Sequence, residues 1–192
     1  RTSHTDNTAT STHTFDEAPI EPLAPHKIDI ETHDDNPPQS KLGTLTGTRL
    51  RSYAFALLTR KEYSKKDLLD KLSQYALNRD EVIELVNELA QENYQSDQRV
   101  AEMTVRSQIR KGKGPNRIKL ALQAKSIDKT LAQNDIEDID WYEQAYALKV
   151  KKYGTEVAKD PKIKAKQIRF LQYRGFEMDS IIKAIQKRAE DD

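Results

Sequence analysis

The chain of 192 residues contains no cysteine, and all four of its histidines lie before residue 49. Without cysteine there is no disulfide framework, no thiol nucleophile and no thiolate zinc site. The part of the chain after residue 48 also lacks the commonest general acid–base and the commonest metal ligand, because histidine supplies both. These absences argue against an enzyme, and we expect neither a cofactor nor a metal centre.

Long apolar runs are absent as well. No run approaches the roughly 20 apolar residues that span a bilayer, and no signal-peptide pattern is visible. We therefore expect a cytoplasmic protein that does not contact a membrane. The chain begins at Arg1 rather than at methionine, which indicates a fragment or a processed chain.

Proline and acidic residues are concentrated at one end of the chain. Residues 1–48 hold five of the seven prolines and only 10 hydrophobic residues, with 3 basic and 8 acidic side chains. A segment this polar cannot bury a core, so we predict that residues 1–48 form a disordered acidic tail rich in Thr, Ser and Pro. The tail is either a solvated leader or a partner-binding segment anchored by Phe15 or by Ile28 and Ile30.

Glycine and proline are scarce beyond the tail. They occur there only at Gly112, Gly114, Pro115, Gly154, Pro161 and Gly175. So few glycines and prolines, together with little alternation of apolar and polar residues at every second position, predict helices rather than strands. The expected helix starts are marked by Ser64, Asn78 or Asp80, Asp97, Pro115, Asp140 and Pro161. Apolar stripes of helical spacing include Val82, Ile83, Val86 and Leu89, then Val100, Met103 or Val105, and Ile109, then Ile118, Leu120 and Leu122.

Leu72, Leu122 and Leu171 recur about every 50 residues and occupy the same place in three predicted helices. Five residues beyond each of them stands another apolar residue, namely Leu77, Ile127 and Phe176. This period is typical of arrays whose units pack on their neighbours. We therefore predict an all-α protein of three tandem three-helix repeats forming an elongated, curved array; the alternative is a single bundle. The repeats align as residues 49–97, 98–140 and 141–188.

Positive charge gathers in the second and third repeats, where residues 98–188 carry 21 basic and 11 acidic side chains. The main candidate contact set is Arg106, Arg110, Lys111, Lys113 and Arg117. Arg106 and Arg110 share a helix face, and the glycine turn after them is expected to offer free backbone amides to an oxyanion. The set predicts contact with phosphates, another polyanion or an acidic protein, and an ordinary solvated face is the alternative.

A second basic stretch lies in the third repeat and gives the secondary candidates Lys166, Arg169 and Arg174. Tyr173 is a candidate for stacking on single-stranded nucleic acid, whereas Phe170 is at an apolar helical position that favours the core. The acidic residues Asp135, Glu137, Asp138 and Asp140 lack the glycine and the spacing of an EF-hand loop. We expect them to complement a helix N-terminus rather than to bind a metal.

Several segments resemble the RecX family of bacterial recombination regulators. Residues 53–64, Y-A-F-A-L-L-T-R-K-E-Y-S, with the D-L and K-L pairs that follow, are similar to the family's A-L-x-x-L-x-x-R-x-x-S-x-x-E-L-x-x-K-L. Residues 111–118 resemble K-G-x-G-x-x-R-I, and residues 170–176, F-L-Q-Y-R-G-F, resemble F-L-x-R-R-G-F. The join at residues 92–97, E-N-Y-Q-S-D, keeps only the tyrosine and aspartate of the family's G-Y-L-N-D, and Ser126 stands where the family often has glycine.

The resemblance implies a cytosolic, non-enzymatic modulator of the RecA recombinase, monomeric when isolated. Members of the family lie in the groove of the RecA–DNA filament and reduce ATP hydrolysis and strand exchange, so DNA bound in the filament is a possible further contact. A direct DNA-binding module for single-stranded or duplex DNA is the alternative. An enzyme is a third option, and it would depend on carboxylates, lysines or tyrosines alone.

Overall fold

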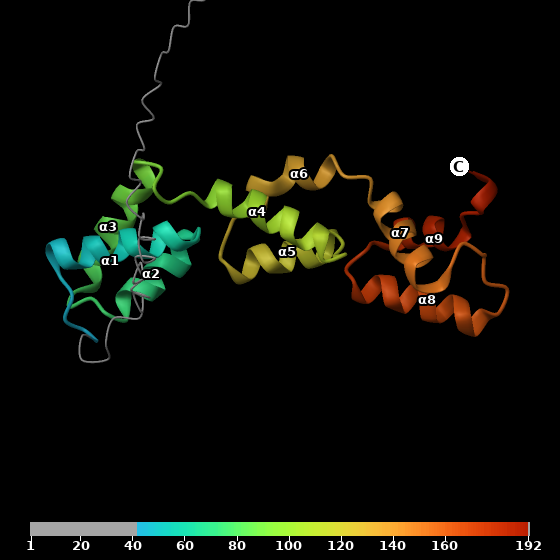
Figure 1. Ribbon diagram of the computed structural model, residues 1–192, viewed down its shortest axis with the longest axis horizontal. Helices are drawn as coiled ribbons and strands as arrows, with labels where there is room; N and C mark the ends of the chain where they lie inside the picture. The colour runs from blue at the N-terminus through green and yellow to red at the C-terminus, as the bar shows by residue number, and fades with distance from the viewer. Residues whose placement is uncertain (1–41, 192) are drawn as a thin grey trace, which may run out of the picture. The chain divides into compact units, whose positions relative to one another are not determined.

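The structure is a computed structural model that describes residues 42–191, and within that range every regular element is a helix (Figure 1). The α-helices are α1 (Gly47–Arg60), α2 (Lys65–Ser73), α3 (Arg79–Gln91), α4 (Asp97–Arg110), α5 (Pro115–Ala124), α6 (Gln133–Glu137), α7 (Trp141–Tyr153), α8 (Pro161–Tyr173) and α9 (Met178–Gln186). Two 3₁₀-helices, η2 (Lys129–Ala132) and η3 (Ala189–Asp191), complete the set. The prediction of an all-α protein is confirmed. None of these helices is long and apolar enough to cross a membrane.

Residues 1–41 of the predicted tail lie outside the described range, but its last residues are ordered. Leu45 is buried and forms a single parallel bridge with Ala76. Its amide donates to the carbonyl of Tyr75 at 2.8 Å, and its carbonyl accepts from the amide of Leu77 at 2.8 Å. The structure therefore differs from the predicted tail boundary at residue 48, because the buried side chain of Leu45 holds this segment on the first repeat.

Most helix starts follow the predicted caps. Side-chain oxygens of Ser64, Asn78 and Asp140 each accept a backbone amide two or three residues further on. Asp97 is the exception, because Ser96 caps α4 by accepting from the Arg99 amide at 3.2 Å. The Asp97 carboxylate instead accepts from the amide of Lys65 at 2.8 Å, at the electropositive start of α2.

The buried apolar side chains form three clusters, each containing one of the three recurring leucines. Leu72, Leu122 and Leu171 are all fully buried. Ile127 and Phe176 are buried too, since their amides fold back onto the carbonyls of Leu122 and Leu171. In the first repeat the equivalent Leu77 is 67% exposed, because its amide pairs with Leu45 instead.

Two other predicted core residues, Ile83 and Leu120, are also exposed, and of the alternatives Met103 and Val105 it is Val105 that is buried. Ile83 lies one residue past Val82 on α3, and Leu120 lies midway between the buried Ile118 and Leu122 on α5. At about 100° per residue, either displacement takes a side chain off the buried face.

Ser126 lies two residues after the end of α5, in the left-handed region, with a φ of 52°. This conformation favours glycine and strains a residue that has a Cβ. The turn therefore has the geometry that glycine would adopt, and the serine at this position is strained. We expect Ser126→Gly to raise the free energy of unfolding by up to about 1 kcal/mol, measured by chemical denaturation. As a control, Gln123→Gly inside the helix should lower it by a similar amount; a Ser126→Gly variant that is destabilised would contradict the strain.

Lys149 is a fully buried lysine on α7, and its ammonium donates to the carbonyl of Glu156 at 2.8 Å. Burial lowers the pKa of this ammonium, and the Glu156 carboxylate opposes the effect only in part. The unfolded chain therefore binds more protons than the folded chain between the lowered pKa and the ordinary value, and Lys149 makes stability rise with pH in that window.

Lys149→Met removes the buried charge while keeping the length of the side chain. We expect the Lys149→Met variant to be more stable than wild type at neutral pH, with a difference that shrinks as pH rises toward the ordinary lysine pKa. Unfolding midpoints measured from pH 7 upward for both proteins test this. A constant difference across the range would show that Lys149 does not titrate differently in the two states.

Candidate functional site: a basic interface

The glycine turn between α4 and α5 packs directly against the turn between α8 and α9. The Gly114 amide donates to the carbonyl of Arg174 at 2.7 Å, and the Asn116 amide donates to that of Gly175 at 3.0 Å. A Cβ built on Gly114 would lie 2.5 Å from the carbonyl carbon of Gly175. The two backbones therefore approach so closely that only glycine fits, and the motif K-G-x-G serves this contact.

The amides of the same turn are already used. Gly112 donates to the carbonyl of Ile109 at 2.9 Å, and Lys113 donates to that of Gln108 at 3.0 Å, which together close the end of α4. The Gly114 amide is bonded across the contact between the two turns, which we call the junction. These three amides are therefore not available to an anion, so the prediction of free amides at this turn is wrong.

Two arginines of the candidate set hold this junction together. The Nε of Arg117 donates to the carbonyl of Tyr173 at 2.8 Å, and its guanidinium lies 4.7 Å from the centre of the Tyr173 ring. Arg174 donates from Nη1 to the carbonyl of Lys111 at 3.0 Å and covers the ring of Phe170. Both side chains are therefore engaged within the protein, and their first role is structural.

The other candidates are more available. Arg106, Arg110 and Lys111 are exposed at the end of α4, and Lys166 and Arg169 are exposed on α8, whereas Lys113 is half-buried. No ion pair within residues 42–191 involves any of these six side chains. Unpaired cations of this kind raise the local positive potential and attract acidic or phosphate-bearing partners.

The structure gathers five cations around one hollow of about 580 Å³ between α4, α7 and α8, which we call the α4–α7 groove. The cations are Arg110, Lys111, Lys151, Lys152 and Arg174. Arg106, Lys113, Arg117, Lys166 and Arg169 do not line it. Lys151 and Lys152 were outside the predicted contact set. They lie four residues after Ala147 and Leu148 on α7, and residues at this spacing share a helix face, so all four line the same groove.

The two aromatic side chains near the groove differ in exposure as the sequence suggests, with Phe170 half-buried and Tyr173 exposed. Phe170 is half-buried beneath Lys152, whose ammonium lies 4.1 Å from the ring centre. Tyr173 is 71% exposed, with the Arg117 guanidinium over its ring. Tyr173 is thus accessible enough to meet a base or another flat group, whereas Phe170 lines the floor of the groove.

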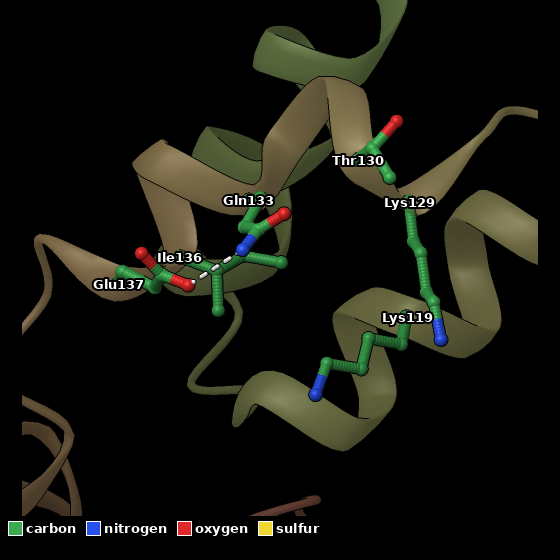
Figure 2. Close-up of a pocket in the computed structure, with 6 residues that line it drawn as sticks. All are labelled: Lys119, Lys129, Thr130, Gln133, Ile136 and Glu137. Carbon is green, nitrogen blue, oxygen red and sulfur yellow. Dashed lines mark hydrogen bonds between the residues drawn. The ribbon is translucent and has the colours of Figure 1, made fainter.

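A smaller hollow of about 260 Å³ lies within the second repeat, and Figure 2 shows Lys119 of α5 and Lys129 of η2 on one side of it. On the opposite side, Gln133 donates to the carboxylate of Glu137 at 2.9 Å. Because Glu137 also lines this hollow, its charge offsets that of the lysines. Among the described residues, no aspartate or glutamate lines the α4–α7 groove, which makes it the stronger anion site.

Comparisons with known proteins agree with the motifs at this junction. The family models for the second and third three-helix domains of RecX match residues 96–134 and 138–185. The chain is 63% identical over 153 residues to the regulatory protein RecX of Acinetobacter baylyi, an alignment that covers 80% of this chain and 96% of the relative. It belongs to the RecX family. The regulatory protein RecX of Neisseria meningitidis serogroup B is 39% identical over 143 residues, covering 74% and 92% of the two chains.

Solved RecX structures share the fold. The crystal structure of RecX from Lactobacillus salivarius superposes with a TM-score of 0.63 at 26% identity, and covers 71% of this chain and 92% of that one. A second crystal structure of a regulatory protein RecX gives a TM-score of 0.61 at 19% identity. The prediction of RecX membership and of an all-helical fold built from three-helix domains is confirmed.

Proposed function

We propose that this chain is a regulator without catalytic activity that binds the RecA recombinase filament in its groove and inhibits ATP hydrolysis and strand exchange. The observation that carries the proposal is the group of exposed cations at the end of α4 that form no ion pair within residues 42–191, in a chain of the RecX family. Arg106, Arg110 and Lys111 would make the main contacts, assisted by Lys113. Lys166 and Arg169 of α8 would add secondary contacts, whereas Arg117 and Arg174 act by holding the junction that positions them.

The arrangement supports a mechanism that depends on binding alone. Cations carried on rigid helices keep a fixed spacing, so they favour one arrangement of the acidic groups on neighbouring protomers over others. A ligand that prefers one geometry of a filament shifts the filament toward it by its difference in affinity for the two. Inhibition would follow if that geometry hydrolyses ATP slowly.

The test is ATP hydrolysis by the cognate recombinase on single-stranded DNA, with the full chain added in increasing amounts. We expect hydrolysis to fall as the chain is added, and binding to the filament to persist at physiological salt when binding to bare DNA is negligible. A chain that binds the filament no better than an unrelated basic protein of equal charge would overturn the proposal. Residues 42–192, which keep Leu45 and all of α1, should inhibit as the full chain does if the tail before them is dispensable.

A direct DNA-binding module is the second candidate, and the exposed Tyr173 ring with Arg117 against it favours this alternative. Stacking on a base would use the open face of that ring, and phosphate contacts would make binding steeply dependent on salt. Strong binding of bare single-stranded DNA at physiological salt, weakened by Tyr173→Ala, would support it. Tyr173→Phe keeps the ring and should bind as wild type does.

A further inference from the structure

We propose that the α4–α7 groove is a docking site for an acidic protein segment that carries apolar side chains. The inference rests on the proposed function, since it names the part of a partner that this surface holds. The groove differs from the contact set on α4 because it is a cavity that combines an apolar floor with basic side chains.

The charge of the groove selects an acidic ligand. Lys151 and Lys152 at the end of α7 are both exposed, and they lie in the same groove as Arg110 and Lys111 from the end of α4. Each pair sits in the last turn of its helix or just beyond it, and no carboxylate from residues 42–191 lines the space they enclose. A carboxylate-rich segment would therefore gain several charge-assisted contacts without repulsion from the groove itself.

The floor of the groove selects a protein rather than a nucleic acid. Ile109, Leu148 and Phe170 are half-buried and line the groove together with Ala147. A phosphate backbone gains nothing by covering these apolar surfaces, whereas leucine-like side chains of a peptide remove them from water. The volume of about 580 Å³ falls within the range of sites that enclose ligands.

The walls of the groove are fixed before any ligand arrives. Arg174 bonds the carbonyl of Lys111 at 3.0 Å and lies over Phe170, which Lys152 also covers. These contacts hold α4, α7 and α8 at one spacing around the cavity. A preformed site of this kind loses little conformational entropy when it binds.

Ala147→Arg is the decisive variant, because Ala147 is exposed, lies mid-helix in α7 and lines the groove. Arginine is a good helix former that fills the cavity and adds positive charge. It should therefore block an apolar side chain without weakening a purely electrostatic attraction. Ala147→Ser is the matched control that leaves the cavity open.

The probes are three fluorescent ligands, measured by anisotropy with the full chain at physiological salt. They are a peptide of alternating glutamate and leucine, the same peptide with serine in place of leucine, and a single-stranded oligothymidylate. We expect the leucine peptide to bind at least about tenfold more tightly than the serine peptide, and Ala147→Arg to remove at least about tenfold of that affinity. The oligothymidylate should bind Ala147→Arg at least as well as wild type.

Charge removal supplies a second arm. Lys151→Ala/Lys152→Ala should weaken the leucine peptide by about tenfold or more, whereas removing two exposed lysines of the same repeat with Lys162→Ala/Lys183→Ala should not. Equal affinity for the two peptides, or undiminished leucine-peptide binding to Ala147→Arg, would overturn the proposal. So would a loss confined to the oligothymidylate, which would mark the groove as a nucleic-acid site.

Inhibition of the recombinase, measured on the same variants, separates this inference from the proposed function. Leucine-peptide binding that follows the expected pattern supports the groove even if the recombinase is unaffected, and then the proposed function fails alone. Inhibition by wild type without discrimination between the peptides supports the proposed function and overturns the groove.

Discussion

Gly114→Ala is expected to lower the free energy of unfolding by about 3 kcal/mol, a large effect for one methyl group. The backbone of Gly114 has a φ of −87° and a ψ of 179°, which alanine adopts freely, so conformational preference contributes almost nothing. The added Cβ would instead lie 2.6 Å from the carbonyl oxygen of Gly175 and 2.6 Å from the amide nitrogen of Phe176. These are backbone atoms that cannot rotate away, so the two turns must separate.

Separation would break the hydrogen bonds that Gly114 and Asn116 donate across the junction, and it would strain the contacts of Arg117 and Arg174. Chemical denaturation with a structural probe in each repeat measures the loss. Gly154→Ala is the matched control, because Gly154 has a φ of 81° but nothing within 4 Å of a Cβ. The ψ of −176° there is a conformation almost confined to glycine, so its cost of about 1–3 kcal/mol is backbone strain alone. A Gly114→Ala variant that loses less than about 1 kcal/mol would show that the junction contributes little.

Removing the α4 cations should have the largest effect on function. We expect the triple variant Arg106→Ala/Arg110→Ala/Lys111→Ala to need about ten times more protein, or more, to half-inhibit the ATP hydrolysis of the recombinase. Each lost contact with an acidic group costs about 0.5–1 kcal/mol, and 1.4 kcal/mol corresponds to a factor of ten. Because all three side chains are exposed and form no ion pair within the described chain, stability should change by less than about 0.5 kcal/mol.

The control for this variant removes equal charge from the first repeat. Arg49, Lys65 and Arg79 are exposed there, and their triple alanine variant should inhibit as wild type does. Equal losses in both variants would mean that net charge, rather than the position of the α4 set, controls the interaction. Arg117→Ala should behave differently from either, since it removes the bond to Tyr173 and therefore lowers stability.

Much of the fold could be predicted because its signals are local. The caps at Ser64, Asn78 and Asp140 act over two or three residues, and the leucines at 72, 122 and 171 sit on helices whose periodicity is visible in the sequence. Errors arose where a distant partner competed with a local rule. Asp97 does not cap α4, because its carboxylate accepts from the Lys65 amide at the start of α2. Leu77 is exposed rather than buried, because its backbone amide pairs with Leu45.

The candidate site was predicted as a set of charges, and the sequence could not rank them. Arg110, Lys111 and Arg117 are equally basic when read along the chain. In the structure the first two are exposed, whereas Arg117 bonds the carbonyl of Tyr173, which lies 56 positions away. No periodicity or motif spacing encodes a contact of that range.

The sequence by itself determined the helical fold, the RecX family and the concentration of positive charge in the second and third repeats, because composition, periodicity and short motifs carry that information. Only the tertiary structure decided which cations form no ion pair within the described residues, and that the amides of the glycine turn are already bonded, two at the end of α4 and one across the junction. It also decided that α4, α7 and α8 enclose a groove that no carboxylate of the described residues lines. Arg174 shows the reason: its guanidinium meets the carbonyl of Lys111 across 63 positions of chain, and such contacts exist only once the helices have packed.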